Sequence, residues 1–81
     1  MRIRVKLFAA PREALQRGEI EQELPAGTSV GGLMEQLALH YAALRPYVTS
    51  VKVAVNRRYA RSADELHDGD EVALLPPVGG G

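Results

Sequence analysis

The stretch Asp70-Glu71-Val72-Ala73-Leu74-Leu75-Pro76-Pro77-Val78-Gly79-Gly80-Gly81 closes the chain, and the arrangement of the rest follows from it. Val72 and Leu74 alternate with their neighbours, as in a strand with one buried face. Proline lacks the N–H that a sheet ladder needs, so Pro76 and Pro77 end this strand. The sequence therefore predicts a last strand over residues 70–75 and a short chain end beyond it.

That chain end has two interpretations. A glycine-rich terminus taken alone is most often a linker or a remnant of cloning. Alternatively, paired prolines favour an extended conformation and glycines can enter a narrow passage, so the end can reach roughly 20 Å at ~3.3–3.6 Å per residue. On the second interpretation, which we favour, Gly79 and Gly80 form a narrow segment without side chains, and the Gly81 carboxylate is the group that reacts. We expect a folded domain over residues 1–76 and a flexible tail over residues 77–81.

Composition limits the class of protein. The chain has 81 residues, of which 46% are hydrophobic and 25% charged, as in one small globular domain. It has no cysteine, which excludes disulfides, thiolate nucleophiles and cysteine-based metal sites and fits a reducing cytoplasm. Ten basic and ten acidic side chains balance, so binding to nucleic acid or to a membrane surface is not indicated. With no long apolar run or signal pattern, we expect one cytoplasmic domain.

Two segments near the start alternate between apolar and charged residues. Residues 2–9 place Ile3, Val5 and Leu7 on one side and basic residues on the other, which predicts a half-buried strand. Residues 19–24 predict a second strand, with Ile20 and Leu24 inward. Its outward side chains are the carboxylates Glu19, Glu21 and Glu23. A metal site would need further ligands, so we interpret them as a solvated sheet edge that discourages pairing with other chains.

Two helices are predicted. Pro11 and Gly18 suit the start and stop of a short helix over residues 11–17. The main helix follows Thr28 or Ser29 as its cap and is ended by Pro46. Its apolar stripe packs on a sheet and consists of Val30, Leu33, Leu37, Tyr41 and Leu44. Gly31 and Gly32 resemble a phosphate loop only superficially, because no Gly-Lys-Ser/Thr follows them.

The second half of the chain predicts three more strands. A third strand over residues 51–56 points Val51, Val53 and Val55 inward and Lys52, Ala54 and Asn56 outward. Residues 56–58 form a turn into a short return strand at Tyr59, residues 64–66 form one helical turn, and Asp68-Gly69 turns into the last strand. Arg57, Arg58 and Arg61 are interpreted as a solvated loop in preference to an anion site.

The order strand, strand, long helix, strand, short strand, strand indicates the fold class. A right-handed crossover returns the later strands beside the first, and one helix then covers one face of a mixed sheet. This is the α+β class, specifically the β-grasp or ubiquitin-like arrangement.

No catalytic constellation is visible in the sequence. His40 and His67 share no metal-ligand spacing and are interpreted as surface residues. Ser29, Ser50 and Ser62 lack the context of a nucleophile. A stand-alone enzyme is therefore not indicated.

The outer face of the predicted sheet is more informative. By alternation, Phe8 and Leu75 point away from the helix beside the small residues Ala54 and Ala73, and Tyr59 borders them. Arg4, Lys6 and Lys52 surround this group. An apolar patch with a charged rim is a candidate partner site, unless loops cover it. Since Leu75 lies just before the chain end, docking here would aim that end at the partner.

Several segments resemble one family. Val5-Lys6-Leu7-Phe8-Ala9 with Arg12-Glu13, the stretch Val53-Ala54-Val55-Asn56, and above all residues 68–78 with the glycines after them are similar to the small subunit of molybdopterin synthase, the MoaD family of sulfur carriers. The resemblance spans the chain and is weakest over the main helix. Gly79 stands where the family more often has a small polar residue, and we expect this glycine to make the tail more flexible.

The resemblance implies a carrier with several partners. An E1-like activating enzyme uses ATP and Mg²⁺ to adenylate the Gly81 carboxylate, and a sulfur donor then converts it to a thiocarboxylate. The large synthase subunit receives the tail, and the sulfur passes to cyclic pyranopterin monophosphate during molybdenum cofactor biosynthesis. No cofactor is expected on this chain itself. The positions that match the family's apolar and tail contacts are Phe8, Tyr59, Leu75, Pro76, Pro77 and Val78.

Two alternatives remain open, and only the first shares the same tail chemistry. One is a related sulfur carrier that serves thiamine synthesis or tRNA thiolation. The other is a ubiquitin-like modifier whose Gly81 forms isopeptide bonds with lysines. Binding of the large synthase subunit would distinguish the first alternative, and covalent ladders on cell proteins would favour the second.

Overall fold

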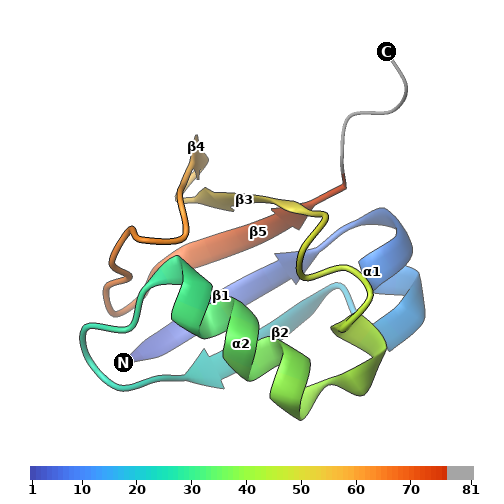
Figure 1. Ribbon diagram of the computed structural model, residues 1–81, viewed down its shortest axis with the longest axis horizontal. Helices are drawn as coiled ribbons and strands as arrows, with labels where there is room; N and C mark the ends of the chain where they lie inside the picture. The colour runs from blue at the N-terminus through green and yellow to red at the C-terminus, as the bar shows by residue number, and fades with distance from the viewer. Residues whose placement is uncertain (77–81) are drawn as a thin grey trace.

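The computed structural model describes residues 1–76 and places a mixed five-stranded sheet behind one main helix (Figure 1). The strand order is β2-β1-β5-β3-β4, in which β1 and β5 are parallel and the other neighbours are antiparallel. The elements in chain order are β1 (Arg2–Leu7), α1 (Ala9–Leu15), β2 (Glu19–Glu23), α2 (Val30–His40), the 3-10 helix η1 (Ala42–Leu44), β3 (Lys52–Val55), β4 (Arg58–Tyr59) and β5 (Glu71–Leu75). The predicted β-grasp fold is confirmed.

The core lies between the sheet and α2. Strand β1 is flanked by β2 and β5, and its alternate residues Ile3, Val5 and Leu7 are almost completely buried, as predicted. Strand β5 contributes Val72 and Leu74 to the same face. The remaining buried apolar residues of the cluster are Ile20, Leu24, Val30, Leu33, Leu37, Leu44 and Leu66. The hydrophobic core is therefore built on the face of the sheet that packs against α2.

The start of α2 is fixed by local bonds. The Ser29 Oγ accepts a hydrogen bond from the Gly32 N–H at 3.1 Å, which confirms Ser29 as the cap. The Val30 N–H donates to the carbonyl of Asp64 at 2.8 Å. A Cβ on Gly32 would lie 2.8 Å from the Thr28 Cγ2, so the side chain of any other residue would collide there. Gly32 is therefore explained by close packing.

Both helices end differently from the prediction. Helix α1 spans Ala9–Leu15 and not the predicted residues 11–17. It ends before Gly18, the predicted stop, because Gln16 adopts a left-handed conformation with φ 57°. Helix α2 ends at His40, well before Pro46, and η1 continues the apolar stripe to Leu44. A 3-10 turn keeps the three-residue spacing of a helix, so the stripe alone could not reveal the break.

The predicted helical turn over residues 64–66 is wrong. A tight turn precedes it, in which the Asp64 side chain accepts a hydrogen bond from the Arg61 N–H at 2.8 Å. The chain is then extended, with Glu65 bridged to Ser29 and the Leu66 N–H bonded to the Thr28 carbonyl at 2.9 Å. This extended path brings Leu66 into the core, where it is 1% exposed.

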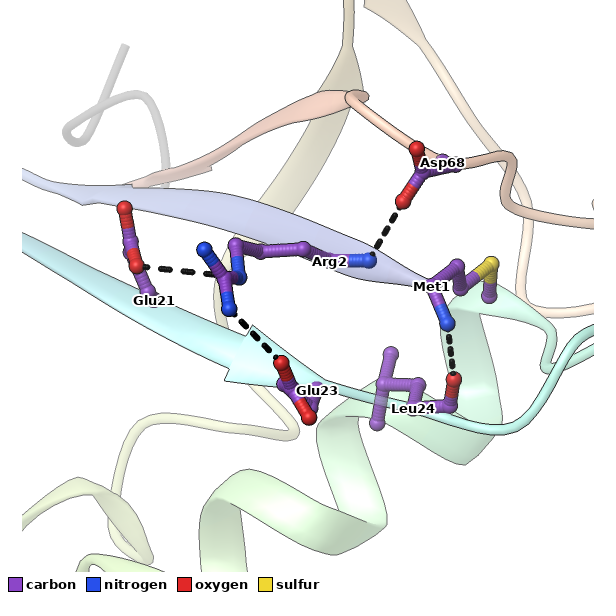
Figure 2. A network of polar contacts seen from close by, with 6 residues as sticks. All are labelled: Met1, Arg2, Glu21, Glu23, Leu24 and Asp68. Carbon is purple, nitrogen blue, oxygen red and sulfur yellow. Dashed lines mark hydrogen bonds and ion pairs between the residues drawn. The ribbon is translucent and has the colours of Figure 1, made fainter.

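Strand β2 is a sheet edge, as predicted from its carboxylates. The Arg2 guanidinium lies 2.8 Å from the Glu23 carboxylate and 4.0 Å from that of Glu21, while the Arg2 backbone N–H donates to the Asp68 carboxylate (Figure 2). The hydrogen bond and charge of Arg2 lower the pKa of Glu23 below its ordinary value, and Glu23 in turn raises the pKa of Arg2. The terminal ammonium of Met1 donates to the Leu24 carbonyl at 2.7 Å and closes this end of the sheet.

Candidate partner-binding surface

The face of the sheet opposite α2 carries a hollow of about 410 Å³. Four strands (β1, β3, β4 and β5) and the β3–β4 turn contribute to it, together with the residue that follows β1. The residues that line it are Lys6, Phe8, Ala54, Arg57, Tyr59, Glu71, Ala73 and Leu75. We refer to it as the outer hollow. The predicted apolar group of Phe8, Leu75, Ala54, Ala73 and Tyr59 is thus brought together in one place.

The strand register explains the hollow. Ala73 of β5 lies directly opposite Lys6 of β1 and Ala54 of β3, and Ala54 lies opposite Tyr59 of β4. These directly opposed residues share one face of the sheet. The two central positions are alanines, so the floor is low, while the longer side chains around them stand higher. Ala54 is only 7% exposed although it points away from the core.

Large apolar side chains stand at the rim of this floor. Phe8 follows β1 in an extended conformation and remains 39% exposed, and Tyr59 is 74% exposed. Leu75, the last residue of β5, is partly buried. Exposed aromatic residues around a shallow apolar floor are typical of protein-binding surfaces.

The charges near the hollow differ in part from the prediction. Lys6 lines it, as expected, but Arg4 lies beside Glu71 and Lys52 does not line it. Glu71 accepts contacts from the Lys6 Nζ at 3.2 Å and from an Arg4 nitrogen at 3.9 Å. Sequence reasoning did not place Glu71 and Arg57 here. Cross-strand pairing would have identified Glu71, because it lies opposite Arg4 in the register.

The chain leaves the sheet at this hollow. Leu75 lines it and Pro76 is exposed immediately after β5. The predicted tail residues Pro77, Val78, Gly79, Gly80 and Gly81 lie outside the described residues. A larger hollow of about 630 Å³ lies between α2 and β3, but neither Leu75 nor Phe8 lines it.

Other kinds of site find little support in residues 1–76. In this part of the chain, no three His, Asp or Glu side chains gather closely enough to hold a metal ion. The side chains of His40 and His67 are both exposed, and the backbone N–H of His67 donates to the Asp70 carboxylate at 2.8 Å. None of the helices described has the length and apolar character to cross a membrane.

Comparison with known proteins places this architecture in a family. The model of the ThiS family matches residues 5–81. A molybdopterin synthase sulfur carrier subunit from Mycobacterium tuberculosis is 42% identical over 100% of this chain and 99% of its own length. The chain belongs to the MoaD/ThiS family.

Solved structures agree with this assignment. Subunit 1 of a molybdopterin converting factor from Pyrococcus furiosus is 35% identical with a TM-score of 0.86, covering 96% of this chain and 99% of that one. SAMP1 from Haloferax volcanii is 27% identical with a TM-score of 0.89, covering 100% of both chains. A protein in a complex of subunits 1 and 2 of the molybdopterin-converting factor from Helicobacter pylori has the same fold, with 23% identity, a TM-score of 0.73 and full coverage of both chains.

Membership of the MoaD/ThiS family confirms the resemblance drawn from the sequence. The chain is a sulfur carrier subunit of molybdopterin synthase, a heteromeric enzyme of molybdenum cofactor biosynthesis. It is thus a component of an enzyme, as the family resemblance implied. What the family assignment leaves to argument is which residues carry out this role.

Proposed function

We propose that the outer hollow docks the large subunit of molybdopterin synthase and that the tail carries sulfur on Gly81. Phe8, Tyr59 and Leu75 make the apolar contacts, while Pro76, Pro77 and Val78 guide the tail into the partner. Gly79 and Gly80 fit the narrow part of the path because they lack a side chain. One observation carries the proposal: Leu75 both lines the docking hollow and begins the chain segment that leads to Gly81.

The chemistry at Gly81 follows from the properties of a carboxylate. A carboxylate oxygen is a poor leaving group, so an E1-like enzyme first lets it attack the α-phosphorus of ATP, with Mg²⁺ on the phosphates and pyrophosphate leaving. A donor at the sulfide oxidation level then displaces AMP from the carbonyl carbon and leaves a thiocarboxylate. This chain holds neither ATP nor Mg²⁺ in the scheme, because both belong to the activating enzyme.

The large subunit then receives the charged carrier. The thiocarboxylate sulfur forms a bond to a carbon of cyclic pyranopterin monophosphate while an oxygen substituent leaves that carbon. Water then hydrolyses the acyl–sulfur bond, which returns the Gly81 carboxylate and leaves the sulfur on the pterin. A dithiolene contains two sulfurs, so two charged carriers are consumed for each product. The carrier supplies delivery and orientation, and the partner supplies the catalytic side chains. Among residues 1–76, the polar side chains that line the hollow are Lys6, Glu71, Arg57 and Tyr59, and Lys6 and Glu71 are paired with each other.

Mass spectrometry tests the tail chemistry directly. The intact chain is incubated with ATP, Mg²⁺, its activating enzyme and a sulfur donor, and we expect one oxygen at Gly81 to be replaced by sulfur. A variant extended by one residue beyond Gly81 is the control, because its terminal carboxylate is displaced from the reacting position. Equal loading of the extended chain at its new terminus would overturn the assignment of Gly81.

A further inference from the structure

The β3–β4 turn holds an arginine in a conformation that is costly for its residue type. The turn has two central residues, Asn56 and Arg57, with φ of 50° and 70°. Tight hairpins of this kind favour Asn followed by Gly, because the second position is left-handed. Asn56 suits its position, but Arg57 has a Cβ that crowds the following carbonyl. Strained residues of this kind often have a role other than folding.

The turn is fixed relative to the outer hollow. The Asn56 side chain donates to the Asp70 carboxylate at 2.9 Å and accepts from the Glu71 N–H at 3.0 Å. The Asn56 N–H donates to the Glu71 carbonyl at 2.8 Å. Because Glu71 also begins β5, these bonds join the turn to the strand that forms the hollow floor. Arg57 lines that hollow.

Most other charges on this face are balanced within the domain. In the β1–β2 register, the basic residues Arg2, Arg4 and Lys6 face Glu23, Glu21 and Glu19, respectively. Arg4 and Lys6 also contact Glu71. Among residues 1–76, Arg57 takes part in none of the ion pairs. The rim beside the β3–β4 turn therefore carries a positive charge that the described part of the domain does not neutralise.

We propose that Arg57 recognises a carboxylate on the docking partner. The complementary protein surface then has an apolar side chain over the alanine floor and an Asp or Glu opposite Arg57. The guanidinium fork suits a carboxylate because it can donate two parallel hydrogen bonds. This inference rests on the proposed function, since it names a contact within the same interface. It explains why an arginine occupies a position that glycine would fill without strain.

Three variants test it against the purified large subunit by isothermal titration, with thermal denaturation of each carrier alone. Arg57→Gly removes the strain and the charge together, so its melting temperature should rise by a few degrees while its affinity falls roughly tenfold or more. Arg57→Gln should lose the same affinity without the gain in stability. Raising the salt concentration should narrow the gap between Arg57→Gln and the parent chain.

Arg58→Gln is the matched control. It removes the same charge one residue later, but Arg58 lines a different hollow, together with Val55 and Asp64. We expect its affinity to stay close to that of the parent. Equal affinity of the parent and both Arg57 variants would overturn this inference and leave the proposed docking surface intact. A lower melting temperature of Arg57→Gly would overturn the strain argument. If the parent chain itself does not bind the large subunit, the proposed docking fails and this inference fails with it.

Discussion

Truncation of Phe8 should weaken docking far more than it weakens the fold. Phe8 is 39% exposed. An aromatic side chain buries about 200 Å² when fully covered, so roughly 80 Å² is left for a partner to cover. At about 25 cal/mol per Å², this area corresponds to ~2 kcal/mol, which is about thirtyfold in the dissociation constant. We therefore expect Phe8→Ala to bind the large subunit about thirtyfold more weakly.

Leu39→Ala is the control for this experiment. Leu39 is 67% exposed, but it projects from α2, the helix on the other face of the sheet. Titration of both variants against the large subunit, with circular dichroism to verify the fold, separates the two faces. Equal losses of affinity in Phe8→Ala and Leu39→Ala would show that general surface hydrophobicity decides binding. Unchanged affinity of a folded Phe8→Ala would refute the outer hollow as the docking site.

Three further predictions concern the fold. NMR titration should show the pKa of the Glu23 carboxyl below its ordinary value, and this pKa should return toward that value in Arg2→Gln. Because the pKa of Glu23 is lower in the folded state, the stabilisation of the fold by this carboxylate is present above the unfolded pKa and is lost as pH falls through the folded pKa. Leu33→Ala should lower the free energy of unfolding in urea by about 2–5 kcal/mol, since Leu33 is 0% exposed. Gly32→Ala should lower the melting temperature despite the better helix propensity of alanine, since its Cβ would lie 2.8 Å from the Thr28 Cγ2; a gain in stability would show that the helix start shifts freely.

Period-two patterns predicted the sheet well because each strand has one buried face. The inward positions of β1 and β5 and the exposed position of Phe8 follow from alternation alone. The turns predicted at residues 56–58 and 68–69 are present because Asn and Gly tolerate positive φ, although Arg58 already belongs to β4. Local chemistry was therefore sufficient wherever one residue type has few conformational options.

Long-range contacts account for what the sequence did not reveal. Leu66 is extended because its N–H bonds to the Thr28 carbonyl, a partner far away in the chain. Glu71 belongs to the outer hollow because the register sets it beside Arg4 and Lys6. Arg57 reads as an ordinary solvated residue until the hollow beside it is known. Each case depends on which strands are neighbours, and composition and spacing do not contain that information.

The parallel pairing of β1 and β5 explains why the candidate anchor and the chain end lie together. Leu7 is directly opposite Leu74 in this pair, so the next residues, Phe8 and Leu75, lie at the same end of the sheet, and both line the outer hollow. Two antiparallel strands would have ended at opposite edges. The crossover through α2 that makes β1 and β5 parallel is thus what brings the exposed aromatic residue beside the start of the segment that leads to Gly81. A partner that binds Phe8 consequently also contacts Leu75, where the segment that leads to Gly81 begins.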